Sequence, residues 1–139
     1  DGFDFPIKIK GIVDRIDELN GVTRIIDYKT GLVTATELKV TDVALLTENY
    51  KHSKAIQVLL YAFLYTKNNN TSNPIEAGII SFKNLKSGVL RINFSEKRGE
   101  NDPLITSERV HDFMEVIQQL ITEIYNPEIP FVEKLNTTR

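Results

Sequence analysis

Residues 11–31 read G-I-V-D-R-I-D-E-L-N-G-V-T-R-I-I-D-Y-K-T-G, and this stretch decides the fold of the chain. Its centre, Asn20-Gly21, is a strong hairpin signal because both residue types tolerate a positive φ. Apolar and β-branched residues dominate on both sides of this turn. The pattern predicts an antiparallel hairpin, with one strand over residues 5–19 and a returning strand over residues 22–28.

Two aspartates and a lysine fall at one end of this hairpin. Alternate residues of a strand share a face, so Asp27 and Lys29 should project together while Tyr28 points away. Antiparallel pairing about the turn places Asp14 near Asp27 on the neighbouring strand. We therefore expect two carboxylates and an ammonium group to converge at one end of the sheet.

Such a cluster indicates a metal site rather than a stabilising core. Two neighbouring carboxylates repel each other and are costly to bury unless a cation lies between them, and oxygen ligands favour Mg²⁺ or Mn²⁺. A metal held by Asp14 and Asp27 would polarise a phosphoryl oxygen, and Lys29 would orient or deprotonate the attacking water. The alternative is a surface hairpin with a solvated Asp–Lys pair, because the tripeptide D-x-K alone is common. The apolar strands and the tight turn around it favour the metal site.

Arg15 and Asp17 alternate with Asp14 along the first strand, so they should face the opposite side. We expect them to form a mutual or cross-strand ion pair. The two histidines of the chain, His52 and His111, are assigned to no metal.

Two long helices are predicted further along the chain. Residues 55–65 are apolar except for Gln57, which indicates a buried helix starting near Ser53. Apolar residues then recur at three- and four-residue steps over residues 110–124, which indicates a helix that starts at Thr106 or Ser107. Asn126-Pro127 should end it.

The shorter elements complete a mixed α/β order. We expect strands over residues 77–83 and 88–94, a loop over residues 68–74, and a short helix capped by Thr41 or Asp42 that runs to about Glu48. The resulting order is β-β-(short α)-α-β-β-α.

Composition and charge set the outer limits. The 139 residues are 41% apolar and contain no cysteine, which favours one globular domain and excludes disulfides and zinc–thiolate sites within residues 1–139. No apolar run approaches the ~20 residues that span a bilayer. The net charge of −2 hides a segment, residues 51–98, with eight basic and two acidic side chains. This segment could face phosphates, or its lysines could be solvated loop residues.

Three motifs resemble those of one known family: G-I-V-D-R-I-D at residues 11–17, I-I-D-Y-K-T-G at 25–31, and Q-V-L-L-Y at 57–61. They resemble the PD-(D/E)XK nuclease superfamily, and more narrowly its RecB/AddB-type exonuclease domains, which are attached to helicases of recombination repair. The resemblance implies an α/β fold with a restriction-endonuclease-like core, in which helices flank a central mixed sheet. It also implies a metal-dependent DNA exonuclease that hydrolyses phosphodiester bonds.

The resemblance assigns roles to the hairpin residues. It implies that Asp14 and Asp27 bind the divalent metal, Mg²⁺ or Mn²⁺, and that Lys29 is catalytic. The main-chain carbonyl of Tyr28 would complete the metal shell. DNA and a helicase domain or subunit are the implied partners, with no membrane and a bacterial-type cytoplasmic location.

Gln57 and Tyr61 match the Q-x-x-x-Y motif of that branch, which lies beside the active site and contacts DNA. Their four-residue spacing puts both on one helical face, and Gln57 is the one amide of an otherwise apolar segment. The alternative is a glutamine satisfied by nearby backbone and a core tyrosine.

The chain also departs from the family pattern. Val13 replaces the proline of the family name. The upstream helix that often supplies a metal ligand would precede Asp1, and the cysteines of an iron–sulfur cluster found in many relatives would follow Arg139. We therefore expect residues 1–139 to be a single nuclease-like domain, truncated at both ends, from a larger protein. The alternative function is a catalytically weak or inactive module for DNA binding or helicase docking.

Overall fold

An antiparallel hairpin forms the edge of the main sheet in the computed structural model, which describes residues 3–95 and 99–132. Strand β1 (Arg15–Leu19) pairs with β2 (Val22–Lys29), and Arg15 lies opposite Ile26. Asn20 and Gly21 both have a positive φ, 54° and 76°, which matches the twist of a two-residue hairpin turn. The predicted hairpin, its turn and its second strand are confirmed.

The first strand is shorter than predicted. Residues 5–14 form no strand, so the prediction of a strand over residues 5–19 is wrong for its first ten positions. This segment packs on helices instead: the Phe5 ring centroid lies 5.3 Å from that of Tyr125, and Ile9 and Val13 pack against the core. The apolar residues at alternate positions therefore reflect an extended segment on a helical surface, not a paired strand.

The main sheet is mixed and has the strand order β1-β2-β4-β5. Strand β2 runs parallel to β4 (Ile75–Ser81), so Lys29 lies opposite Ser81, and β4 is antiparallel to β5 (Val89–Arg91). The strand predicted over residues 88–94 is split at Ile92. Its second part, β6 (Asn93–Phe94), pairs instead with β3 (Lys39–Val40) in a separate two-stranded sheet.

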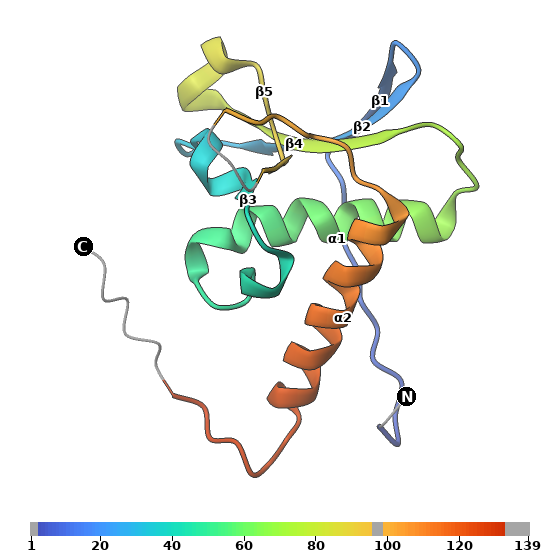
Figure 1. The fold of residues 1–139 in the computed structure, drawn as a ribbon, viewed down its shortest axis with the longest axis vertical. Coiled ribbons are helices and arrows are strands. Elements are labelled where there is room, and N and C mark those ends of the chain that lie inside the picture. Colours follow the sequence, from blue (N-terminus) through green and yellow to red (C-terminus); the bar gives the residue numbers. More distant parts are fainter. Residues whose placement is uncertain (1–2, 96–98, 133–139) are drawn as a thin grey trace.

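Helix α1 (Ser53–Asn68) connects the parallel strands β2 and β4 and packs against one face of the sheet. Figure 1 shows α1 beneath the sheet and α2 (Ser107–Ile124) crossing α1 on the side away from the sheet. Both helices are confirmed at the predicted starts, and the Thr106 side chain caps α2 by accepting from the Arg109 N–H. The expected α/β architecture, a mixed sheet packed against helices, is thereby confirmed.

Within residues 3–95 and 99–132, four short 3₁₀ helices connect the larger elements. The short helix predicted to run to Glu48 is only η2, whose Asp42 cap is as predicted. The strand predicted over residues 77–83 ends earlier, because Phe82 already belongs to η4. The four elements are η1 (Ala35–Leu38), η2 (Val43–Leu45), η3 (Tyr50–His52) and η4 (Phe82–Ser87).

The two faces of β2 have different surroundings. Ile25 and Asp27 are buried on the face that packs against α1, and Lys29 follows on the same face. We call this the inner face. Ile26 is also buried but lies outside the main core cluster. By alternation it faces the other side of the sheet, together with Arg24 and Tyr28. We call this second side the outer face, and no α-helix of the described residues packs on it.

Close packing of β4 on β5 depends on a glycine, which yields a stability prediction. A Cβ on Gly78 would lie 2.4 Å from the Leu90 carbonyl oxygen, an approach that the paired backbones cannot relieve. Gly78→Ala should therefore lower the free energy of unfolding by about 3 kcal/mol, as measured by urea denaturation.

Gly31→Ala is the matched control, because nothing lies within 4 Å of a Cβ built there. Its free energy of unfolding should stay within about 0.5 kcal/mol of wild type. Equal destabilisation by the two substitutions would contradict the packing argument.

Candidate active site

Asp27 and Lys29 lie together at the end of β2. The Asp27 side chain is buried, with 4% of the residue exposed, and its Oδ2 lies 2.9 Å from the Lys29 Nζ. A buried carboxylate is costly unless it is paired and hydrogen-bonded, and Lys29 supplies the pairing charge. The predicted convergence of these two side chains is what the alternation of β2 produces.

Gln57 of α1 joins the two charged groups. Its Oε1 accepts a hydrogen bond from the Lys29 Nζ at 2.8 Å, and its Nε2 donates to the Asp27 Oδ1 at 3.3 Å. The same Nε2 donates to the Tyr61 hydroxyl at 2.7 Å. Asp27, Lys29, Gln57 and Tyr61 therefore form one hydrogen-bonded network, and the amide orientation is fixed because only its oxygen can accept from an ammonium group.

Tyr61 enters this network as an acceptor, which leaves its own hydroxyl proton without an acceptor among the described residues. The ring is set by a close approach of the chain: a Cβ on Gly11 would lie 2.8 Å from the Tyr61 Cε1 and 3.2 Å from the Leu64 Cδ1. Glycine at position 11 therefore lets the segment before β1 lie directly on α1. A free hydroxyl donor thus lies beside the Asp27–Lys29 pair.

Asp14 lies just before β1 and reaches the same end of β2. Its Oδ2 accepts a hydrogen bond from the Tyr28 main-chain N–H at 2.8 Å, and the residue is exposed. The register of the hairpin, with Arg15 opposite Ile26, would place Asp14 opposite Asp27 if it were continued by one pair. The structure thus brings Asp14 to the backbone between Asp27 and Lys29.

The oxygen atoms at this end of the sheet suit a hard divalent cation. Asp27 Oδ2 is buried and, apart from its ion pair with Lys29, has no hydrogen-bond partner among the described residues. An acceptor atom left in this state fits a cation ligand. No three histidine, cysteine, aspartate or glutamate side chains within residues 3–95 and 99–132 form a metal-holding group. A metal here would therefore bind two carboxylates, main-chain oxygen and water.

The opposite face of the hairpin holds the predicted ion pairs. Arg24 donates to both carboxylate oxygens of Asp17, at 2.6 and 2.8 Å, and the Arg15 NH2 lies 2.5 Å from the same carboxylate. The hydrogen bond from Arg24 holds the pKa of Asp17 below its usual range. The prediction that Arg15 and Asp17 face away from Asp14 and pair with each other or across the strands is confirmed.

The basic segment 51–98 is only partly neutralised. Lys54 pairs with Glu37 at 2.5 Å and Arg91 with Glu76 at 3.2 Å. Lys83 and Lys86 are exposed and form no ion pair with any described residue. Two further members of the segment, Lys97 and Arg98, lie outside the described residues.

Ser81 supports the site and was not singled out from the sequence. Its hydroxyl donates to the Gly31 carbonyl at 2.8 Å and accepts from the Val33 N–H at 3.2 Å, and the side chain is fully buried. It therefore ties the loop after Lys29 to the end of β4. The polar residue that closes an otherwise apolar strand was the available signal.

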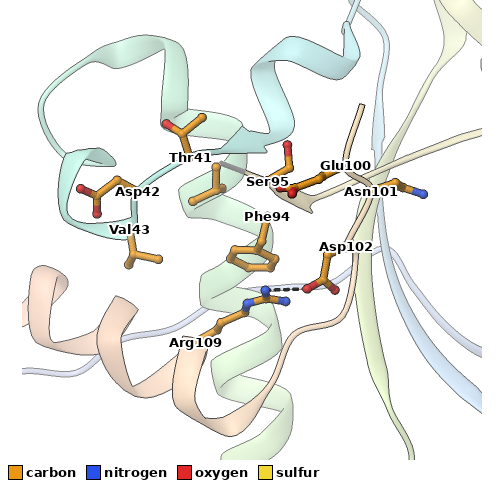
Figure 2. Close-up of a pocket in the computed structure, with 10 residues that line it drawn as sticks. Thr41, Asp42, Val43, Phe94, Ser95, Glu100, Asn101, Asp102 and Arg109 are labelled. Carbon is orange, nitrogen blue, oxygen red and sulfur yellow. Dashed lines mark hydrogen bonds and ion pairs between the residues drawn. The ribbon is translucent and has the colours of Figure 1, made fainter. Parts of the chain in front are cut away.

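A separate open cavity of about 960 Å³ is lined by none of the predicted site residues, which are Asp14, Asp27, Tyr28, Lys29, Gln57 and Tyr61. Figure 2 shows that Arg109 lies under Phe94 and points to Asp102 there. The guanidinium donates to Asp102 at 2.6 Å and to the Leu104 carbonyl at 2.6 Å, and its carbon lies 4.2 Å from the centroid of the Phe94 ring. These contacts fasten the first turn of α2 to the chain before it.

This contact gives a pH prediction. The hydrogen bond from Arg109 lowers the pKa of Asp102, so the unfolded chain binds more protons than the folded one in the acid range. The resulting stabilisation is complete above about pH 4 and is lost as the pH falls through the lower pKa of the folded state. Asp102→Asn should cost under about 1 kcal/mol at pH 7, and the difference from wild type should be smaller at about pH 3, below the pKa of the unfolded chain.

Urea denaturation at both pH values measures this difference. Asp112→Asn changes an exposed carboxylate of α2 that has no arginine partner among the described residues. It is the control, and its difference from wild type should be the same at both pH values. A difference between wild type and Asp102→Asn that is equal at both pH values would contradict the assignment.

The comparisons with known proteins give one match. The model of the family described as the PD-(D/E)XK nuclease superfamily matches residues 1–136. No curated protein and no solved structure matches the chain significantly. Neither α-helix of the described residues is long and apolar enough to cross a membrane.

Proposed function

The chain belongs to the PD-(D/E)XK nuclease superfamily, and we propose that it is a divalent-metal-dependent deoxyribonuclease that uses Asp14, Asp27 and Lys29. The observation that carries this proposal is the buried Asp27 carboxylate, which has Lys29 at 2.9 Å and one oxygen without a hydrogen bond among the described residues. A carboxylate held in this state is suited to bind a cation beside a fixed ammonium group.

Asp14, Asp27 and the Tyr28 main-chain carbonyl are the proposed metal ligands. Mg²⁺ or Mn²⁺ bound there would lower the pKa of a bound water and polarise a phosphoryl oxygen. Asp14 already reaches this point through its hydrogen bond to the Tyr28 N–H. The Tyr28 amide is therefore held at this point, which supports the proposal that its carbonyl is a ligand, while its side chain lies on the outer face.

Lys29 is the proposed catalytic cation. An ammonium group has three N–H donors, and Gln57 accepts from one of them, while Asp27 pairs with its charge. A remaining N–H is available to the attacking water or to a phosphoryl oxygen that gains negative charge in the transition state. The side chain is 30% exposed, so substrate can reach it.

Gln57 and Tyr61 extend the site along α1. Gln57 fixes Lys29 and Asp27 relative to each other, and Tyr61 keeps a hydroxyl proton that it can donate to a DNA phosphate. Their Q-x-x-x-Y spacing supports the finer proposal of a RecB/AddB-type exonuclease that works with a helicase domain or subunit in recombination and repair.

The first test removes the proposed catalytic charges. Asp27→Asn and Lys29→Gln should each lower kcat for DNA cleavage in Mg²⁺ or Mn²⁺ by about 10²-fold or more, because each change removes a charge that acts in the transition state. Asp112→Asn and Lys67→Gln make the same chemical changes at exposed positions on the helices and should leave kcat within about twofold. Undiminished cleavage by Asp27→Asn or Lys29→Gln, with the fold intact by circular dichroism, would sink the assignment.

The second test measures metal binding without activity. Mg²⁺ or Mn²⁺ should raise the Tm of wild type. At a metal concentration a hundredfold above Kd, the free energy of unfolding should increase by about 2.7 kcal/mol. Asp27→Asn and Asp14→Asn should abolish this shift, and Asp112→Asn should retain it. A shift that survives both site substitutions would place the metal elsewhere and contradict the proposal.

A second candidate function is a catalytically weak or inactive module for DNA binding or helicase docking. It is favoured by the limited ligand set, since the described residues supply two carboxylates here and no group of three acidic or histidine ligands. Salt-sensitive DNA binding that is indifferent to metal and to Asp14→Asn would support this candidate over the nuclease.

A further inference from the structure

Two aromatic rings lie side by side at the end of the sheet that carries the candidate active site. Tyr28 of β2 and Phe82, the residue after β4, have ring centroids 5.8 Å apart and planes inclined by 36°. They are 36% and 52% exposed, so water reaches much of both rings. Contiguous exposed apolar surface is a candidate interaction surface.

The surface around these rings is basic. Lys83 and Lys86 follow Phe82 in η4, the coil that Figure 1 shows between β4 and β5. Both lysines are exposed and form no ion pair with any described residue. Residues 77–95 contain three basic side chains and no aspartate or glutamate. The positive charge beside the rings is therefore not neutralised by its own segment.

The rings and the candidate active site share one sheet end but lie on opposite faces. Tyr28 stands between Asp27 and Lys29 in the chain, and Phe82 follows Ser81, the residue paired with Lys29. Both β2 and β4 end here, and the carboxyl ends of parallel strands are the common location of ligand sites in open α/β sheets.

We propose that Tyr28, Phe82, Lys83 and Lys86 form a stacking platform for single-stranded nucleic acid. An unpaired base would stack on the exposed face of Phe82, and the two lysines would neutralise the phosphates on either side of it. The bases inside a duplex do not offer their faces, so the platform selects single strands or frayed ends over intact duplex. This inference rests on the proposed function only in its choice of a nucleic acid as the occupant.

Binding measured without hydrolysis tests the platform. Fluorescence anisotropy with a labelled single-stranded oligonucleotide in EDTA should show about tenfold weaker binding by Phe82→Ala. Phe82→Trp should bind at least as tightly as wild type, because it keeps a ring for stacking. Binding of the corresponding blunt duplex should change by less than about twofold in both variants.

The lysines are tested by salt dependence. Lys83→Gln/Lys86→Gln should reduce the slope of log Kd against log salt for single strands by about 1.4, since each phosphate contact contributes about 0.7. Lys67→Gln and Phe131→Ala are the matched controls: Lys67 lies in the last turn of α1, and Phe131 is an exposed ring in the segment after α2. Both should bind single strands as wild type does.

The possible outcomes separate this inference from the proposed function. Unchanged single-strand binding by Phe82→Ala, or an equal loss for single strands and duplex, overturns the platform even if wild type cleaves DNA. A protein partner on this surface would give that same unchanged binding. Conversely, the expected losses in EDTA support the platform even if wild type shows no metal-dependent cleavage, an outcome that would count against the nuclease alone.

Discussion

The burial of the Asp27 carboxylate is the constraint on which the site depends. A carboxylate on the inner face of the sheet is tolerated only with a countercharge and hydrogen-bond donors, and Lys29 and Gln57 supply them from two different elements. Gln57 can do so only because α1 packs across the end of β2 and brings the Gln57 amide within hydrogen-bond distance of both charged groups. The ion pair of Lys54 with Glu37 holds the first turn of α1 to η1, so the helix start is fixed independently. One buried charge therefore ties the packing of the helix to the chemistry of the strand.

The parts of the fold that depend on local pattern could be predicted from the sequence. Two positive φ values at Asn20-Gly21 set the turn, and alternation along β2 then put Asp27 and Lys29 on one face. The strand predicted over residues 5–14 is absent and the strand predicted over residues 88–94 is split at Ile92, for one shared reason. An extended segment shows the same alternation whether it pairs in the sheet, lies on helices as Ile9 does, or changes sheets at Ile92. The choice depends on partners distant in the chain, which no local pattern contains.

The candidate site was predictable to a similar depth. The spacing of Gln57 and Tyr61 put them on one helical face, but their link to Lys29 depends on how α1 lies against β2. The sequence does not predict the roles of Ser81 and Phe82, because both belong to an apolar run that indicates only a buried strand. Their roles follow from register, since Ser81 lies opposite Lys29 and the next residue emerges at the sheet end. Contacts between elements therefore carry the information that the sequence pattern lacks.

The geometry of a strand explains how the proposed catalytic site and the proposed stacking platform would lie close together without interfering. In a D-x-K sequence on a strand, the middle residue must face the side opposite the two charged residues. The Tyr28 amide therefore donates to Asp14, while its ring lies against Phe82 on the outer face. A substitution of that ring leaves the backbone groups in place. Substitutions can thus change the outer face without changing the backbone groups of the inner face, even though both belong to one stretch of β2.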